Sequence, residues 1–148
     1  MSARITASLF GAALALTVTA AAEDGPNCYS SFTKVNVCEY ARRVQAEMAP
    51  LLPQKMNVNI TLTSILTIGP RVVIVGRWQL TKAEMDSTQR DASYSHEQWA
   101  TAMQQATQNY VCGVEPLAAF VRLGGQMQYN YVTSDNFLAF SPLVDRCK

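Results

Sequence analysis

The strongest constraint on the fold of this 148-residue chain is its set of four cysteines, Cys28, Cys38, Cys112 and Cys147. An even number of cysteines in an exported chain indicates disulfide bonds. Four cysteines allow three pairings, and the sequence alone does not choose between them. We favour Cys28–Cys38, which would pin the N-terminal arm to the first helix, and Cys112–Cys147, which would tie the end of the chain to a long helix. No metal site is predicted, because the chain has no Cys-x-x-Cys motif and a single histidine.

The first 22 residues indicate that the chain is exported. Arg4 supplies a short positive start, the stretch from Ile5 to Val18 is apolar or small, and Ala20-Ala21-Ala22 fits the small-residue motif of a cleavage site. The stretch is too short, and too rich in Ala and Thr, to supply the roughly 20 strongly apolar residues of a membrane-spanning helix. We therefore predict a cleaved signal peptide at 1–22, a single domain at 23–148, a periplasmic or secreted location and no membrane span after cleavage.

The charge of the mature chain bears on its partners. The full chain has 12 basic and 11 acidic residues, and removal of Arg4 with the signal peptide leaves 11 of each. Nucleic-acid binding requires a basic face that neutralises phosphates. A neutral chain is therefore not expected to bind nucleic acid.

Hydrophobic periodicity predicts an α+β domain. Apolar residues at helical spacing predict helices, and alternating polar and apolar residues predict strands. The expected helices run from Asn36 to Pro50, from Ser95 to Cys112 and onward from Pro116, and the expected strands span Asn57–Ile68, Val72–Leu80, Gln126–Thr133 and Phe137–Val144. Each consecutive pair of strands is expected to form a hairpin. The predicted fold is a four-stranded antiparallel sheet of two hairpins, covered by two to three helices and held by two disulfides.

The sequence contains no evident catalytic arrangement. His96 is the only histidine and lies in the expected first turn of a helix, where a surface position is favoured. A catalytic site that pairs a nucleophile with a histidine is therefore not expected. The polar segment Thr81–Tyr94 is expected to be a loop, with one helical turn around Ala83 to Asp86 as the alternative. Its carboxylates Glu84, Asp86 and Asp91 are expected to be solvated. We predict no catalytic residues, no cofactor and no enzymatic activity.

Aromatic residues gather on the two C-terminal strands, and one more lies on an earlier strand. They are Trp78, Tyr129, Tyr131, Phe137 and Phe140. We favour the interpretation that they form the core beneath the helices. The alternative is an aromatic groove or sheet face that binds a peptide or helix of a protein partner, which makes these five the candidate partner-binding residues.

The C-terminal part of the chain also resembles a known group of proteins. A helix that ends at Cys112 is followed by Glu115-Pro116-Leu117, Leu123-Gly124-Gly125, the alternating segment 127–131 and a final Cys147. This pattern resembles small periplasmic α+β proteins of Gram-negative bacteria, many of them uncharacterised, and the α/β pilotins of type II secretion systems. The resemblance covers roughly Met56 to Cys147. It implies a four-stranded sheet flanked by helices and a Cys112–Cys147 bridge.

The same resemblance bears on function, with one departure. Pilotins of this kind are lipoproteins that escort a secretin to the outer membrane, whereas Cys28 here follows Asp24-Gly25-Pro26-Asn27, which is no lipobox. We therefore expect a soluble periplasmic protein without catalytic activity that binds another envelope or secretion-system protein in an accessory role. One alternative is an inhibitor or immunity protein that blocks a periplasmic hydrolase or toxin through the Thr81–Tyr94 loop. Another is a small secreted enzyme whose carboxylates are brought together by the fold.

Overall fold

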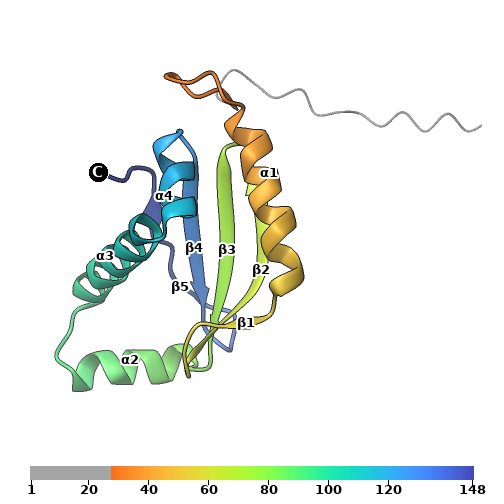
Figure 1. Ribbon diagram of the computed structural model, residues 1–148. Helices are drawn as coiled ribbons and strands as arrows, with labels where there is room; N and C mark the ends of the chain where they lie inside the picture. Colours follow the sequence, from red (N-terminus) through yellow and green to blue (C-terminus); the bar gives the residue numbers. More distant parts are fainter. Residues whose placement is uncertain (1–27) are drawn as a thin grey trace, which may run out of the picture.

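The computed structural model of this chain describes residues 28–148, so the predicted signal peptide lies outside the described residues. Helices and strands alternate in groups along the chain (Figure 1), which confirms the predicted α+β class. The elements, in chain order, are α1 (Val37–Met48), the 3-10 turn η2 (Ala49–Leu51), β1 (Gln54–Lys55), β2 (Ile60–Ile68), β3 (Arg71–Trp78), α2 (Lys82–Asp91), α3 (His96–Gly113), α4 (Glu115–Arg122), β4 (Gln126–Val132), β5 (Leu138–Phe140) and β6 (Leu143–Val144).

The strands form one mixed sheet in the order β1–β2–β3–β4–β5, with β6 also paired to β4. The hairpin between β2 and β3 is antiparallel as predicted, with Ile65 opposite Ile74. β4, however, runs parallel to β3, with Arg71 opposite Gln126. The prediction of an all-antiparallel sheet of four strands is therefore wrong. The chain leaves the far end of β3, passes through three helices and returns beside the start of β3, and such a crossover joins parallel neighbours.

The predicted strand Phe137–Val144 is divided into two short strands, which both pair with β4. Pro142 lies between them, and its carbonyl accepts a hydrogen bond from the Tyr129 N–H at 3.0 Å. Proline has no N–H of its own to donate to a ladder. The ladder is therefore interrupted at this residue, and β5 and β6 remain short.

The segment Thr81–Tyr94, predicted to be a loop, instead contains the ten-residue helix α2. Its start is a capping box, in which the Thr81 hydroxyl accepts from the Glu84 N–H and the Glu84 carboxylate accepts from the Thr81 N–H at 2.8 Å. Only Met85 and Gln89, one turn apart, are buried on this helix. Because so narrow a buried stripe leaves little apolar periodicity in the sequence, the prediction of a loop was wrong.

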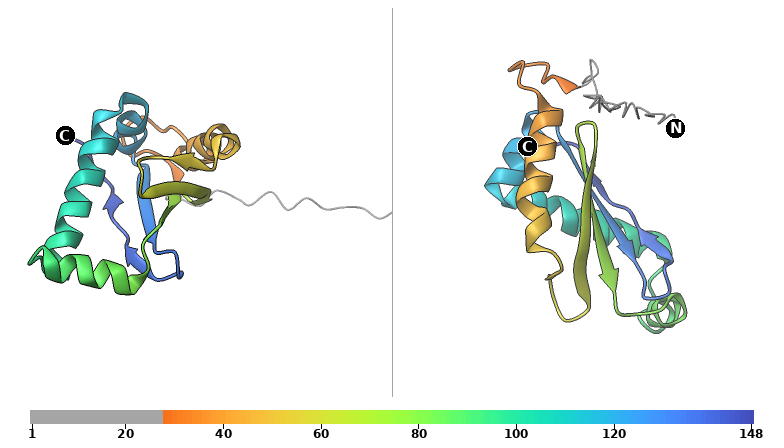
Figure 2. Two further views of the ribbon diagram at one scale, coloured as in Figure 1. Left: turned by 90° about the horizontal axis from the view of Figure 1, so that it is seen from below. Right: turned by 90° about the vertical axis from the view of Figure 1, so that its right-hand side faces the viewer.

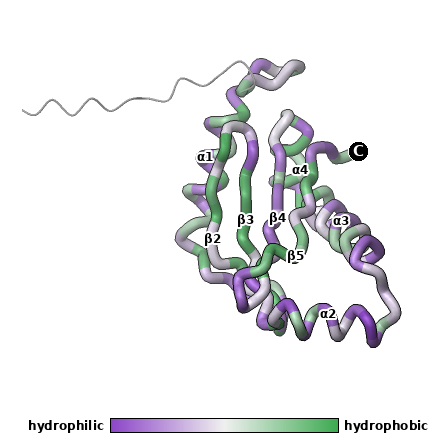
Figure 3. Tube along the Cα trace, turned by 180° about the vertical axis from the view of Figure 1, so that it is seen from behind, coloured by the Kyte–Doolittle hydropathy of each residue, from purple (hydrophilic) through white to green (hydrophobic). Residues whose placement is uncertain are grey.

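The helices α1, α3 and α4 lie on one face of the sheet (Figures 1 and 2). Alternate strand residues point to that face, and the buried ones are Leu62, Ile65, Val72, Ile74, Trp78, Met127, Tyr129, Tyr131, Phe140 and Val144. Figure 3 views the sheet from the other side. There, Arg71 donates to Gln126 at 2.9 Å and to Gln128 at 3.1 Å, and Gln128 donates to Ser141 at 2.7 Å. The core is therefore built on one face of the sheet, and a polar row crosses the other.

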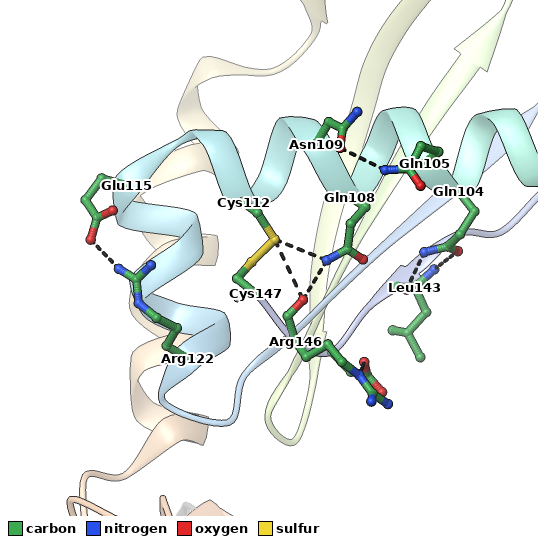
Figure 4. Close-up of a disulfide and its surroundings, with 11 residues drawn as sticks. Gln104, Gln105, Gln108, Asn109, Cys112, Glu115, Arg122, Leu143, Arg146 and Cys147 are labelled. Atoms are coloured by element: carbon green, nitrogen blue, oxygen red, sulfur yellow. Dashed lines mark hydrogen bonds and ion pairs between the residues drawn. A yellow bond between two sulfur atoms is a disulfide. The ribbon is translucent and has the colours of Figure 1, made fainter.

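Both favoured disulfides are present. Cys28–Cys38 joins the N-terminal arm to the first turn of α1, and Cys112–Cys147 joins the last turn of α3 to the end of the chain across 35 residues. Hydrogen bonds support the second bridge (Figure 4): Gln108 Nε2 donates to the Arg146 carbonyl at 2.6 Å, and the Gln104 amide bonds both backbone groups of Leu143. A bridge of this kind typically contributes about 2–4 kcal/mol by restricting the unfolded chain. The C-terminal segment is thus fastened along α3.

Gly125 supports a first prediction, because a Cβ at this position would overlap the fully buried ring of Phe120. We expect Gly125→Ala to lower the free energy of unfolding by about 1–3 kcal/mol, the usual effect of overpacking a core. Urea denaturation followed by circular dichroism measures it. The matched control is Gly113→Ala at the end of α3, where a Cβ meets nothing within 4 Å. The control is expected to be neutral or slightly stabilising, and equal losses in both variants would contradict the prediction.

Candidate partner-binding groove

A groove of about 240 Å³ opens on the helix-covered side of the sheet, between α3 and the connection from β1 to β2. Tyr129 and Tyr131 of β4 form its floor. We call it the tyrosine groove, and its lining residues are Met56, Asn57, Ile60, Met103, Ala106, Thr107, Tyr110, Tyr129 and Tyr131. A neighbouring hollow of about 330 Å³ lies between α1 and α4.

One wall of the tyrosine groove is a face of α3. Met103, Thr107 and Tyr110 are spaced by four and three residues, which places them on one side of a helix. The helix begins at a capping box in which the Ser95 N–H donates to Gln98 Oε1 at 2.8 Å, and its last turn is held by the Cys112–Cys147 bridge. Because both ends are fixed, this wall is a rigid element of the fold.

Three tyrosines give the groove its aromatic surface. The rings of Tyr129 and Tyr131 lie nearly parallel with centroids 6.2 Å apart, and Tyr110 meets Tyr129 edge-on at 6.4 Å. Tyr129 and Tyr131 are 1% and 5% exposed, whereas Tyr110 is 47% exposed. Burial raises the pKa of both floor tyrosines above the usual value. The floor is therefore a closed, neutral aromatic surface, and Tyr110 is its accessible rim.

The polarity of the groove limits what it can bind. The described residues that line it carry no charged side chain. The buried Thr107 hydroxyl lies close to the Tyr131 hydroxyl, where it partly offsets the rise that burial causes in the pKa of that tyrosine. Met56 and Met103 add flexible, polarisable side chains that adapt to the shape of a bound group. Over the same residues, 28–148, there is no group of three or more His, Cys, Asp or Glu side chains that could hold a metal ion. The groove is suited to an uncharged and mainly apolar group.

The five predicted aromatic residues fall into three settings. Trp78 and Phe140 are buried and pack with Trp99 at centroid distances of 5.5 and 5.7 Å, so they belong to the core as the favoured interpretation states. Tyr129 and Tyr131 are equally buried but also form the groove floor. Phe137 is 38% exposed, and the Lys82 ammonium lies 5.1 Å from its ring centroid.

Only Tyr129 and Tyr131 of the groove were among the predicted partner-binding residues, and the other seven were missed: Met56, Asn57, Ile60, Met103, Ala106, Thr107 and Tyr110. Met103 and Tyr110 belong to the apolar stripe of the long helix, which indicates a buried face without showing where that face remains open. Met56 lies in the short connection after β1, where periodicity carries no signal. The groove is formed by three chain segments that only the fold brings together.

The residues considered for catalysis have structural contacts. Hydrogen bonds from the Thr81 backbone and side chain lower the pKa of the Glu84 carboxyl, which is part of the cap of α2. Asp86 pairs with Lys82 at 2.6 Å within the same helix. His96 is exposed and stacks on Phe140 with centroids 5.1 Å apart. These contacts assign Glu84 and Asp86 to the stability of α2.

Known proteins resemble this chain in structure rather than in sequence. No protein-family model matches the sequence, and no curated protein matches it significantly. A candidate secreted protein from Pseudomonas aeruginosa superposes with a TM-score of 0.58 at 14% identity, over 74% of this chain and 88% of that one. The type II secretion system pilotin AspS of Vibrio cholerae superposes with a TM-score of 0.54 at 15% sequence identity, over 74% of this chain and 88% of that one. The pilotin EpsS of the Vibrio vulnificus type 2 secretion system superposes with a TM-score of 0.57 at 10% sequence identity, over 76% of this chain and 94% of that one.

The chain therefore has a pilotin-like α+β fold, as the resemblance at its C-terminal part implied. At these identities the likeness establishes the fold alone. Among residues 28–148, none of the helices has the length and apolar character needed to cross a membrane.

The buried tyrosines generate a second prediction, which concerns alkaline pH. The pKa values of Tyr129 and Tyr131 are raised in the folded protein, while an unfolded tyrosine has a pKa of about 10. The unfolded chain therefore loses these protons first, so the stabilisation is complete below about pH 10 and is lost as the pH rises further. Each such tyrosine lowers the free energy of unfolding by at most about 1.4 kcal/mol for each pH unit above that value.

Tyr129→Phe keeps the ring and removes the titrating group. We expect its free energy of unfolding to fall less steeply between about pH 10 and 11.5 than that of the wild type, as measured by urea denaturation at a series of pH values. Tyr29→Phe is the control, because Tyr29 is 53% exposed. An unchanged alkaline slope in Tyr129→Phe would show that the prediction is wrong.

Proposed function

We propose that this chain is a non-catalytic accessory protein of the bacterial envelope, which binds a segment of another envelope or secretion-system protein in the tyrosine groove. The observation that carries the proposal is the uncharged lining of tyrosine and methionine, with Tyr110 accessible at the rim. The pilotin-like fold supports it, because two of the similar structures are pilotins of type II secretion systems.

Further exposed apolar residues lie close in the chain to residues that line the groove. Met56 lines the groove at 39% exposed, Leu51 and Val58 flank it in the chain at 65% and 82%, and Val114 follows one turn after Tyr110 at 37%. Gatherings of exposed apolar side chains commonly mark sites of protein binding. A partner segment with several apolar side chains would remove these residues from water, whereas a small ligand would cover few of them.

The location that we propose is the periplasm or the outside of the cell, reached through the predicted signal peptide. The Cys28 sulfur of this chain is bonded to Cys38, so it is not available for attachment of a lipid. The proposed function therefore consists of partner binding and does not use Cys28 as an anchor.

The two alternative functions find less support. An inhibitor acting through an extended Thr81–Tyr94 loop has no such loop to insert, because the segment is the capped helix α2 with Met85 in the core. The enzyme alternative needs paired carboxylates that the fold brings together, and the carboxylates of Glu84 and Asp86 are engaged within α2.

A third prediction tests the groove with a charged side chain. Ala106 is an exposed lining residue on α3, so Ala106→Arg places a cation in an uncharged groove without opening the core. The chain tagged after Lys148 would be crosslinked in its own host, and the captured proteins identified by mass spectrometry. We expect Ala106→Arg to reduce capture of a stoichiometric envelope partner at least about tenfold, because an unpaired charge in an apolar contact loses its hydration.

Thr101→Arg is the matched control, since Thr101 is exposed on α3 and does not line the groove. Both variants should keep the wild-type circular dichroism and both disulfides. Equal capture by Ala106→Arg and the wild type would exclude the tyrosine groove as the binding site. The absence of any envelope or secretion partner in the wild-type sample would overturn the proposed function.

A further inference from the structure

The most exposed methionine in the described part of the chain lies at the tyrosine groove. Of the six methionines, all but Met1 belong to residues 28–148. Met56 lines the groove and is 39% exposed. The others meet water less: Met85 and Met127 are 1% and 0% exposed, and Met48 and Met103 are half-buried. Among the described residues, the most accessible thioether therefore lies at the proposed binding site.

Hydrogen bonds hold the backbone of Met56 in place. This residue follows β1 in the connection to β2, at the lower end of the sheet in Figure 1. Its N–H donates to the Ile60 carbonyl at 3.0 Å, and Asn57 Oδ1 accepts from the N–H groups of Asn59 and Ile60 at 2.8 and 2.9 Å. The exposure of the side chain is thus a property of the folded connection, and an oxidant in solution can reach it without local unfolding.

The chemistry of a thioether determines what this exposure does. Hydrogen peroxide transfers an oxygen atom to the sulfur of methionine: the O–O bond breaks, an S–O bond forms, the sulfur loses two electrons and the peroxide is reduced to water. The product, methionine sulfoxide, is polar, whereas the thioether is apolar. Hydrogen peroxide is uncharged, and the described residues that line the groove carry no charged side chain. Its approach therefore meets no electrostatic barrier from these residues.

We propose that Met56 is a site of oxidation by peroxides, and that its conversion to the sulfoxide lowers the affinity of the tyrosine groove for its protein partner. The effect on affinity rests on the proposed function, whereas the oxidation itself does not. The reduced side chain is apolar and adapts its shape to a bound group. The sulfoxide oxygen is hydrated in the free protein and loses that hydration when a partner segment covers it.

The oxidation is tested on the exported protein with both disulfides intact. The protein is exposed to hydrogen peroxide for a series of times, quenched and digested with trypsin. Cleavage after Lys and Arg places each methionine of residues 28–148 in a separate peptide, so mass spectrometry measures each sulfur in one sample. We expect Met56 to be oxidised at least about tenfold faster than Met85 and Met127, because these two react only when the fold opens. Equal rates at the three residues would overturn the proposal.

The effect on binding is tested with two variants of the same residue. Met56→Leu keeps an apolar side chain of similar volume and has no sulfur, and Met56→Gln places a permanent polar group at the same position. The chains are tagged after Lys148, treated with peroxide, freed of it and crosslinked in envelope extract of the host. Peroxide should lower partner capture by the wild type about tenfold and leave Met56→Leu unchanged, and Met56→Gln should show the loss without peroxide.

The results separate this inference from the proposed function. Equal losses in the wild type and Met56→Leu after peroxide, or no loss in either, would overturn the effect on binding. Absence of an envelope partner in the untreated wild type would instead contradict the proposed function, and the oxidation rates would still decide whether Met56 is an oxidation site. Circular dichroism of the treated protein should match that of the untreated protein, which excludes unfolding as the cause of a lost partner.

Discussion

Parallel pairing of β3 with β4 is the constraint on which the arrangement of this protein depends. The chain leaves β3 at Trp78 and enters β4 at Gln126, which lies opposite Arg71 at the other end of β3. A crossover of this length has to pass over one face of the sheet, and the apolar side chains of β3 and β4 decide which face. The helices α3 and α4 therefore cover the same side as α1. The tyrosine groove lies on that side, between α3 and the connection from β1 to β2.

Patterns that are local in the chain were sufficient for the three longer strands β2, β3 and β4, the long helix with its Ser95 cap and the placement of Trp78 and Phe140 in the core. They were insufficient for the sheet order, because alternation shows which face of a strand is buried and not which strand lies beside it. The helix α2 was missed because it buries only Met85 and Gln89. Phe137 was placed in the same predicted strand as Phe140, but β5 begins at Leu138. Phe137 therefore lies in the connection before the strand and is 38% exposed, whereas Phe140 is buried.

The floor of the tyrosine groove belongs to the core as well as to the surface. Tyr129 and Tyr131 pack beneath the helices with almost no exposure, and the same rings close the bottom of the groove. Substitutions at these positions therefore change stability and binding together. Substitutions in the wall and rim, at residues such as Ala106 and Tyr110, are expected to change binding with little effect on stability. These side chains line the groove without filling the core. A partner would thus meet a rigid floor and an adaptable rim.

One buried polar group beside α3, Gln89 Nε2, has no hydrogen-bond partner among the described residues. A group of this kind disfavours folding by about 1–3 kcal/mol. The Cys112–Cys147 bridge, which fastens the end of α3, contributes about 2–4 kcal/mol, a similar amount in the opposite direction. The crosslink can thus offset the cost of this unpaired group. A small domain with such a bridge tolerates an unpaired buried group, whereas an unbridged domain of the same size would have less stability to spare.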